Sequence, residues 1–536
     1  MRFVGFVFVC TALSTAAISA QTPASGAANR KHATAIRVPN GSIRVDGRLD
    51  EDVWQKATPI VDFVQKEPTE GARPTDEMDV RIAYDDTVLY VGARMRSKDG
   101  RIQAPLGRRD SIEQAEHILV SFDTFLDRRT ASVFGVTASG VRIDRYHAND
   151  QEESFDAGFD PVWRAETIVS GDQWTAELWI PFSQLRFSPR TDQVWGLNVS
   201  RFRPTLDEAD YWIPIPRTVR AWASRFGELT GISNIVPSRR IEALPYVAGA
   251  STVNGDRDER NPFDDGKNLD GRIGADIKMG LGPNLTLETT INPDFGQVEA
   301  DPAEVNLTAF ETRFPEKRPF FTEGAGLFNI GHPNFYYSRR IGTRPIGPAT
   351  GDYVDYPDAN SIVAAAKLTG RLPSKTSIGV ITAVTDDEDA RVATGPTLAQ
   401  SDVDVAPHAY HMVGRVLQEF GPSASTAGLL INYVHRDFKD DSPLENLYTR
   451  NALGVAGNTL LRFKGGRYEF RASGGASYLN GTEPAVERVQ RASAHYAQRP
   501  DREYSRLDPT LTSLAGWSVQ MNFDKTSGRH WLWGAN

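Results

Sequence analysis

The chain contains almost no cysteine. Its single cysteine, Cys10, lies within an apolar N-terminal stretch, and the residues before it (Val7, Phe8 and Val9) do not form a lipoprotein box. Once that stretch is removed, no thiol remains. This excludes disulfides, cysteine-ligated zinc and a cysteine nucleophile.

The common catalytic signatures are also missing. The nine His residues form no HExxH pair, and the sequence has no GxSxG elbow and no P-loop. The formal net charge of −9 argues against nucleic acid as a partner. No reaction class is therefore indicated by a motif.

The N-terminus has the pattern of an export signal. Arg2 supplies a positive charge, an apolar run follows to Ile18, and the small residues Ser19 and Ala20 precede Gln21. The pattern predicts a secretory signal peptide over residues 1–20, with a retained N-terminal anchor as the alternative. Residues 21–33 are rich in Pro, Ala, Gly and Ser and are predicted to form a flexible tether. The 536 residues that the chain contains are too many for one core, so more than one domain is expected.

Residues 34–235 are predicted to form a β-sandwich. Short strand-like segments alternate with turn signals, as in "DVRIAYDDTVLYVGARM", where Val80, Ile82 and Tyr84 alternate with polar or small residues before an Asp-Asp turn. Many such strands over this length are typical of a sandwich, here of the jelly-roll kind.

From residue 240 to residue 536 the strand pattern changes. Segments such as "RIGADIKMGL" are about ten residues long and rich in Gly and Ala; Ile273 and Ile277 share one face, and Asp276 and Lys278 share the other. This length and alternation fit a tilted crossing of a bacterial outer membrane, where only a closed barrel satisfies the backbone. We expect an antiparallel transmembrane β-barrel with about eleven strands in this region. A second soluble all-β domain is the alternative.

The C-terminal sequence "HWLWGAN" lies within a strand pattern and ends on Asn536. Outer-membrane barrels generally finish on a complete strand with a terminal aromatic residue. The predicted barrel is therefore expected to be incomplete at its C-terminus.

An insertion at about residues 293–360 interrupts the strands. In "NPDFGQVEADPAEVNLTAFETRFPEKRPFF", Asp301 and Glu304 frame Pro302 as a helix start, and Pro315 stops the predicted helix. A hydrophobic hook is expected to follow and to fold into the barrel mouth or lumen, with carboxylates paired to inward-facing arginines. This plug either braces and closes the barrel or acts as a gate or binding surface. Its proposed residues are Asp294, Glu299, Asp301, Glu304, Phe310, Phe314, Arg318, Phe320, Phe321, Arg339 and Arg340.

Two sets of motifs resemble known families. The segments "IRVDGRLDEDVW", "DVRIAYDDTVLYVGARMRSKD" and "WTAELWIPFSQLRF" resemble the family 9 carbohydrate-binding module, a β-sandwich. The segments "TINPDFGQVEADPAEVNLTAFETRFPEKRPFFTEG" and "YYSRRIG" are similar to the domain-of-unknown-function family 5916, in which a family-9-like module precedes an outer-membrane barrel. The resemblance implies binding of a polysaccharide or oligosaccharide between tryptophans, structural calcium, and contact with outer-membrane lipid.

Five residues are candidates for the sugar site. In "WTAELWIPF", alternation assigns Glu177 and Trp179 to an outward face, where a ring beside a carboxylate suits a pyranose. Trp163, Trp212 and Trp222 are the other candidates, and packing in a core is the alternative for each. Trp54 and Trp195 are expected in the core.

Asp123, Asp127 and Asp144 are the candidate calcium ligands, because carboxylate oxygens are the ligands that calcium prefers. Ion pairs with Arg128 and Arg129 are the alternative explanation for these acidic residues.

Three functions are compatible with the sequence. In the first, the sandwich captures a glycan and the barrel anchors or passes it. In the second, the protein is an outer-membrane glycoside hydrolase acting in polysaccharide catabolism, which needs two carboxylates across a cleft. In the third, the sandwich of a structural envelope protein recognises another protein or a cell-surface polysaccharide. An even-stranded barrel would place both termini, and so the sandwich, in the periplasm.

Overall fold

The computed structural model describes most of the chain after residue 29. The residues that it does not describe are 1–29, 113, 149, 154, 157, 158, 189, 217, 218, 220, 236–240, 254–257, 265, 283, 294–310, 332, 333, 422, 502–505, 529 and 530. The predicted signal peptide therefore lies outside the described residues. The first strand begins at His32, inside the predicted tether.

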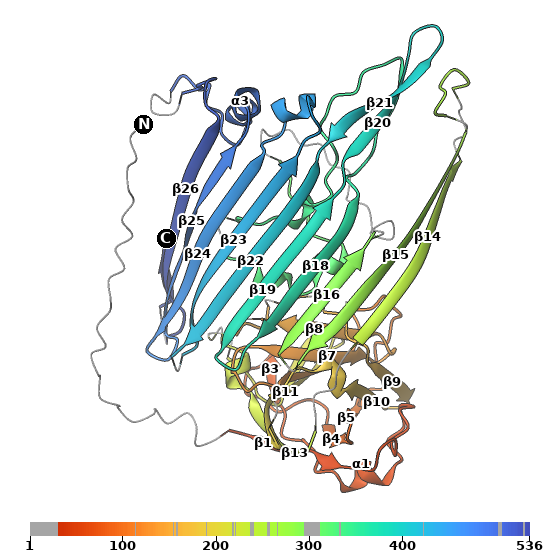
Figure 1. Cartoon of the computed structure of the whole chain (residues 1–536). Helices are drawn as coiled ribbons and strands as arrows, with labels where there is room; N and C mark the ends of the chain where they lie inside the picture. The colour runs from red at the N-terminus through yellow and green to blue at the C-terminus, as the bar shows by residue number, and fades with distance from the viewer. Residues whose placement is uncertain are drawn as a thin grey trace.

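The N-terminal region is a β-sandwich, as predicted (Figure 1). Its eight-stranded sheet has the order β1-β13-β11-β6-β7-β8, with β12 pairing with β11 and β3, and its five-stranded sheet has the order β2-β4-β5-β10-β9. The strands are β1 (His32–Thr34), β2 (Ile36–Arg37), β3 (Val64–Glu67), β4 (Met78–Tyr84), β5 (Val88–Arg96), β6 (His117–Asp123), β7 (Ala131–Thr137), β8 (Arg142–His147), β9 (Arg164–Ser170), β10 (Gln173–Pro181), β11 (Asp192–Arg203), β12 (Glu208–Tyr211) and β13 (Gly227–Ser233).

The sandwich core lies between these two sheets. Val80, Ile82 and Val91 enter it from the five-stranded sheet, because alternate residues of a strand face the same side. Trp195 is fully buried in the same core, and Trp54, which belongs to α1 (Asp52–Lys56), is 1% exposed in a smaller cluster of buried residues. The prediction that these two tryptophans are core residues is confirmed.

The C-terminal region forms one large antiparallel sheet. Among the described residues it contains eleven strands in the order β14-β15-β16-β18-β19-β22-β23-β24-β25-β26-β27. Their bounds are β14 (Ile241–Val253), β15 (Lys267–Leu281), β16 (Leu285–Ile291), β18 (Ile362–Arg371), β19 (Thr376–Thr385), β22 (His408–Phe420), β23 (Ser425–Asp437), β24 (Asn451–Phe463), β25 (Tyr468–Asn480), β26 (Ser513–Lys525) and β27 (Trp533–Ala535). A smaller sheet, β17-β20-β21, projects beyond it (Figure 1); these strands are β17 (Tyr353–Asp355), β20 (Glu388–Thr394) and β21 (Ala399–Ala406).

The large sheet is curved but is not closed into the predicted barrel (Figure 1). In the described chain, β14 pairs with β15 alone and β27 pairs with β26 alone. The directions of the two edge strands explain why they do not pair with each other. Eleven strands with antiparallel neighbours leave the first and last strand pointing the same way, so β14 and β27 cannot pair antiparallel with each other.

The two faces of the large sheet reverse the usual pattern of a soluble protein. On β22, the large apolar residues Met412 and Val416 are exposed, whereas Arg415 and Glu419 are buried on the opposite face. On β16, Thr286, Glu288 and Thr290 are buried, while Ile291 on the other face is exposed. The sheet therefore exposes large apolar side chains on its outer face, whereas its inner face holds charges beside buried apolar residues such as Val413. No helix in the described part of the chain is both long and apolar enough to cross a bilayer.

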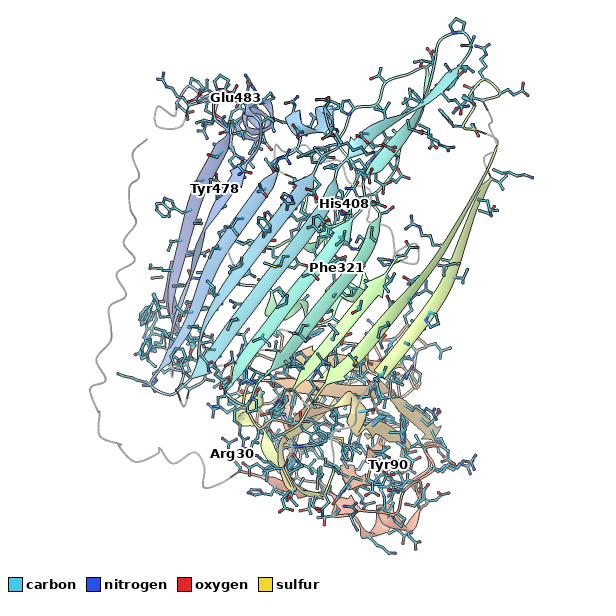
Figure 2. All side chains as sticks on the ribbon, in the orientation of Figure 1. Arg30, Tyr90, Phe321, His408, Tyr478 and Glu483 are labelled. Atoms are coloured by element: carbon cyan, nitrogen blue, oxygen red, sulfur yellow. The ribbon has the colours of Figure 1, made fainter. Side chains whose placement is uncertain are left out.

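The inner face of the large sheet is covered by a hook segment, residues 311–341. It contains the short helix α2 (Pro319–Thr322) and the 3-10 turns η3 (Ala325–Leu327) and η4 (Ser338–Arg340). The predicted hydrophobic packing is present: Phe321, which Figure 2 labels, and Phe328 are buried against Ile381, Val413 and other apolar residues of the sheet, with Phe320 packed beside them.

The predicted helix of the plug lies mainly outside the described residues, as do Asp294, Glu299, Asp301, Glu304 and Phe310. Phe314 is described, and its backbone N–H donates to the Tyr337 hydroxyl at 3.1 Å. The remaining turns and helices of the chain are η1 (Phe182–Gln184), η2 (Ala223–Arg225), η5 (Pro443–Asn446) and α3 (Glu483–Arg491).

The predicted pairing of plug carboxylates with inward-facing arginines is wrong for Glu311 and Glu316. Glu316 pairs with Arg318 at 2.8 Å, and Glu311 pairs with Arg340, so both arginines belong to the hook segment itself. Arg339 donates to the Pro315 carbonyl. These charges are therefore paired by neighbours within the hook segment and not by residues of the sheet.

Lys367 ties the hook segment to the sheet. Its ammonium lies 2.7 Å from Glu288 on the neighbouring strand and donates to the carbonyls of Phe320 at 2.6 Å and Glu323 at 2.7 Å. These three acceptors use all three N–H groups of a lysine that is 1% exposed. One buried cation therefore holds both the strand pair and the hook.

The sandwich contacts the end of the large sheet where β22 and β23 are joined (Figure 1). Arg371 bridges the two parts, with Nε 3.1 Å from Asp127 of the sandwich and Nη2 2.8 Å from Glu419 of β22. Asp150 lies 3.8 Å from Arg462, and the Gly324 backbone N–H donates to Asp156 at 2.8 Å. The contact is thus largely made of charges.

Replacing Lys367 with methionine tests its role. Lys367→Met leaves the Glu288 charge and two carbonyls without their buried partner, and losing one member of a buried pair costs about 3–5 kcal/mol. We expect residues 311–341 to become sensitive to limited proteolysis in the full chain. Lys464→Met is the matched control, because Lys464 is exposed and forms no ion pair with a described residue. Equal protease resistance of the two variants would contradict this role.

Candidate functional site

A cleft of about 420 Å³ opens on the outer face of the eight-stranded sheet. Strands β6, β7, β8, β11 and β12 form its floor, and connecting segments form its walls. Its lining residues are Ile112, Gln114, His117, Leu119, Ser121, Val133, Arg145, His147, Glu152, Asn198, Val199, Ser200, Arg201, Phe202, Ala209, Tyr211 and Trp222.

The floor is built by strand register. Arg145, Val133, Ser121 and Asn198 are successive cross-strand partners from β8 to β11. Side chains alternate along each strand, so these residues face outward. Their neighbours in the strands, such as Ile118 and Val120, face the core on the other side of the sheet.

Two further rows extend the floor toward β12. Leu119 is the cross-strand partner of Ser200, which pairs with Tyr211, and His117 is the partner of Phe202, which pairs with Ala209. The floor therefore mixes rings with small polar groups.

One wall holds a neutralised carboxylate. The Tyr211 hydroxyl donates to Glu152 at 2.6 Å, and the Lys66 ammonium lies 2.5 Å from the other Glu152 oxygen. The same ammonium lies 4.9 Å from the Tyr211 ring centroid. Glu152 is thus held in place, with its charge balanced by a lysine.

The cleft also holds two rings in tilted contact. The ring centroids of His147 and Trp222 are 4.2 Å apart at an interplanar angle of 39°. The buried Trp222 Nε1–H has no hydrogen-bond partner in the part of the chain that the structure describes. It is a donor available to a ligand oxygen.

Both histidines of the cleft are neutral at pH 7. Burial lowers the pKa of His117 and of His147 to about 4. The Nδ1 atoms of these two rings lie 2.9 Å from the Ala115 carbonyl and 3.0 Å from the Gln151 carbonyl. A carbonyl accepts, so each Nδ1 donates and each Nε2 is left as an acceptor. The cleft therefore offers ring faces, neutral donors and neutral acceptors.

Of the five predicted sugar-binding residues, Trp222 alone lines this cleft. Trp163 is fully buried and donates to Asp144 at 2.9 Å, and Trp212 is 2% exposed and donates to Asp62 at 2.8 Å. Neither ring can stack on a ligand. For these two residues the alternative, packing in a core, is correct.

The outward placement of Glu177 is wrong. Glu177 does lie on the opposite face from Trp174, but residues 43–56 cover that face, and Glu177 is fully buried. Its carboxylate accepts from Trp54 Nε1 and from the backbone N–H groups of Asp46 and Gly47, each at 2.9 Å. Burial raises the pKa of Glu177 to about 7. It ties down a loop and is closed to a ligand.

Trp179 is partly buried in the same small cluster. The Arg164 guanidinium lies 5.1 Å from its ring centroid, on the neighbouring strand. One ring face is thus already occupied by a cation. The structure does not bring Trp179 together with the cleft.

The predicted calcium ligands do not form one group. Asp144 binds Arg109, with Oδ1 2.7 Å from Nη2, whereas Asp123 accepts from the backbone N–H groups of Asp127 and Arg128. Asp127 accepts from Thr130 and contacts Arg371. The predicted pairs with Arg128 and Arg129 are largely replaced by these backbone and interdomain contacts.

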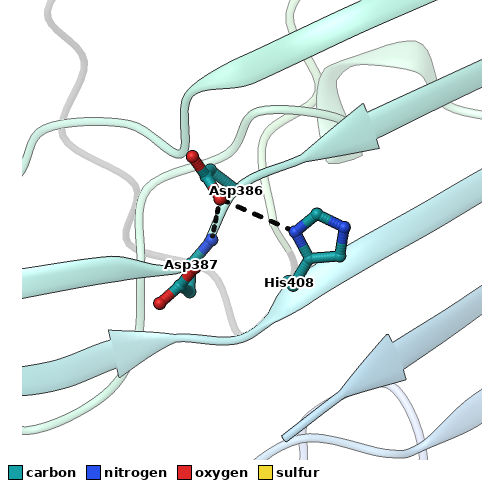
Figure 3. A group of neighbouring side chains, drawn as sticks. All are labelled: Asp386, Asp387 and His408. Carbon is teal, nitrogen blue, oxygen red and sulfur yellow. Dashed lines mark hydrogen bonds and ion pairs between the residues drawn. The ribbon is translucent and has the colours of Figure 1, made fainter. Parts of the chain in front are cut away.

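The acidic groups with metal-like spacing lie elsewhere in the described chain. Asp386, Asp387 and His408, drawn in Figure 3, have ligand atoms within 4.8 Å of one another, as do Asp387, Asp389 and Asp404. The Lys439 ammonium lies 2.7 Å from Asp387 and 3.5 Å from Asp389, and it also contacts Asp404. Hydrogen bonds to these carboxylates raise the pKa of Lys439. A lysine therefore already pairs with three of the four aspartates of this cluster.

Most cleft residues escaped prediction because they are not tryptophans. His117, Ser121 and Arg145 are ordinary polar members of alternating strands, and Tyr211 lies in the short strand β12. Register between strands distant in the sequence brings them together. The sequence held one indication of these residues: in "HILVS" and "RIDRYH", every second residue faces away from the core.

The sequence also matches known proteins in part. Residues 237–442 match the family described as "Domain of unknown function (DUF5916)". A family 9 carbohydrate-binding module from Caldicellulosiruptor kristjanssonii, solved with cellotriose, is 17% identical, covers 39% of this chain and 99% of its own, and has a TM-score of 0.28. The same kind of module solved with glucose is 17% identical, covers 39% of this chain and 100% of its own, and has a TM-score of 0.29. No curated protein matches the sequence.

The buried His147 predicts a specific acid sensitivity. Its pKa is about 4 when folded and 6.5 when unfolded, so the unfolded state binds more protons and stability falls as the pH drops from 6.5 toward 4. At pH 5 this group alone removes about 2 kcal/mol. His147→Asn, which keeps a donor for the Gln151 carbonyl, should lose less stability between pH 7 and 5 than the parent protein.

Urea unfolding of the full chain, followed by tryptophan fluorescence at the two pH values, measures this difference. The matched control is His495→Asn, because His495 is exposed. An unchanged pH dependence in His147→Asn would show that His147 protonates freely in the folded protein.

Proposed function

We propose that this protein binds carbohydrate in the cleft of its sandwich and is held in a bacterial outer membrane by its large sheet. The cleft carries the first part of the proposal. A volume of about 420 Å³ lies within the usual range for small-molecule sites, and it suits a short saccharide.

The lining chemistry supports a sugar as the ligand. Sugars present apolar C–H faces to aromatic rings and hydroxyl groups to neutral donors and acceptors. Tyr211 and Phe202 supply rings, while Ser121, Ser200 and the two neutral histidines supply polar atoms. These groups lie on adjacent strands of one sheet and need little rearrangement to bind a ligand.

The same lining favours binding over hydrolysis. A glycosidase generally needs two carboxylates flanking the bond that it cleaves. Among the lining residues in the described chain, Glu152 is the single carboxylate, and it is engaged by Lys66 and Tyr211.

The outer face of the large sheet supports the membrane part of the proposal. On β22, Tyr410 and Phe420 are exposed on this face ten residues apart, and Tyr478 and Phe463 lie near opposite ends of β25 and β24. Ten residues at about 3.3 Å each, tilted by about 40°, rise about 25 Å, the height of the apolar band of a membrane barrel. Aromatic residues at both borders of an apolar band are typical of such proteins.

The proposal includes closure of the sheet into a barrel. An open edge in lipid leaves backbone groups unsatisfied. Because β14 and β27 point the same way, closure requires at least one further strand antiparallel to both.

The lengths of the connections support a periplasmic sandwich. At the end that contacts the sandwich, β22 joins β23 and β24 joins β25 by tight turns, whereas longer segments join β23 to β24 and β25 to β26 at the other end. Bacterial outer-membrane barrels have short turns on the periplasmic side and longer loops outside.

Binding to a glycan panel that includes cellotriose and glucose tests the cleft. Tyr211→Ala removes a ring and the hydroxyl that orients Glu152, so we expect the affinity of the full chain for its best ligand to fall at least about tenfold. Trp179→Ala is the control and should bind normally. The reverse result would place the ligand on the five-stranded sheet, and no glycan binding at all would refute the proposal.

A charge on the outer face tests the membrane part. Val416→Arg puts an arginine at mid-height of β22, at a cost of about 2–4 kcal/mol if that face meets lipid. We expect less protein in the outer-membrane fraction of Gram-negative cells, while Gln418→Arg, closer to the border, should insert nearly normally. In intact cells the inserted parent protein should keep its sandwich from added protease. Equal insertion of both variants, or a cleaved sandwich, would contradict the corresponding part.

A further inference from the structure

The charged groups around the cleft are unequally paired. Glu152 is balanced by Lys66. The Arg201 guanidinium turns into the core, where it donates to Glu116 and, at 2.7 Å, to the Arg96 carbonyl. These two charges are already neutralised by ion pairs within the protein.

Arg145 is different. It lies in the outward row of the cleft floor, opposite Val133 on β7. Its guanidinium carbon is 4.3 Å from the centroid of the Phe155 ring, and among the described residues it has no hydrogen bond to a carboxylate or carbonyl. The nearby carboxyl of Asp110 accepts instead from the Asp144 backbone N–H at 2.9 Å. One half-buried cation of the cleft therefore has no directly bonded carboxylate among the described residues, although the charge of Asp110 attracts it.

A guanidinium without a directly bonded carboxylate at such a place favours an anion. Burial lowers the pKa of Arg145, which reflects the cost of holding the cation away from water, and the charge of the nearby Asp110 offsets only part of that cost. The planar fork of N–H donors fits a carboxylate with two parallel hydrogen bonds. The Phe155 ring restricts the guanidinium, so less freedom is lost on binding.

From this arrangement we infer that the cleft prefers an acidic saccharide, whose uronate carboxylate pairs with Arg145 while its ring packs among Tyr211, Phe202 and the neutral histidines. The inference rests on the proposed carbohydrate binding and specifies the class of sugar. A neutral sugar leaves the buried cation without a directly bonded anion, whereas a uronate removes that cost. Arg145 thus selects for a negative charge on the ligand, and the other lining residues bind the sugar ring and its hydroxyl groups.

A pair of trisaccharides that differ only at C6 tests this preference. Cellotriose is the neutral probe, and its β-1,4-linked glucuronic acid counterpart is the acidic probe, each titrated into the full chain in detergent by calorimetry. We expect the acidic probe to bind at least about tenfold more tightly at low salt, with the difference shrinking as salt is added. Arg145→Gln should remove this difference by lowering the affinity for the acidic probe, and Arg145→Lys should keep part of it.

The outcomes separate this inference from the function on which it rests. Equal binding of both probes by the parent protein, or a preference that survives in Arg145→Gln, would overturn the acidic preference and leave carbohydrate binding standing. Failure of both probes to bind would overturn both. Displacement of the acidic probe by equimolar inorganic phosphate would identify a general anion site and overturn the uronate assignment.

Discussion

The period of two along a β-strand is the constraint on which this structure depends. In the sandwich it sends Val120 into a core and Ser121 into a cleft, although the two residues are adjacent. In the large sheet the same period sends Val416 outward and Arg415 inward. The two regions differ in which face is apolar and outermost, and the membrane placement that we propose for the large sheet rests on that difference.

Buried charge is the second organising feature. The large sheet holds Glu288, Lys367, Arg415 and Glu419 on its inner face, where each needs a partner. Lys367 finds its partners in a strand neighbour and in the hook segment, and Glu419 finds Arg371, which also contacts the sandwich. The hook and the sandwich are therefore attached to the sheet through charges that the sheet could not satisfy alone. Such contacts specify geometry more than they add stability.

The cleft combines these two features. Its floor is an ordinary outward face of a sheet, and its walls belong to segments that also reach the large sheet. Asp150 accepts hydrogen bonds from the backbone of Trp222 and Ser224 and lies within 3.8 Å of Arg462. The loop that carries the Trp222 wall is thus positioned partly by the second region. A ligand in the cleft would lie close to the junction of the two regions.

The sequence alone determined the period of every main strand, and with it the sandwich, the long alternating strands after residue 240 and the hydrophobic character of the hook. It could not determine which faces are covered. The parity of Glu177 was read correctly, but residues 43–56 bury it, and no local pattern predicts that distant contact. Nor could it show that His117, Asn198 and Tyr211 meet in one cleft, since register between distant strands decides this. The alternation of a strand can be recognised from adjacent residues. Which residues are buried, and which meet in one cleft, depends on the packing of segments that are distant in the sequence, and only the tertiary structure decides that.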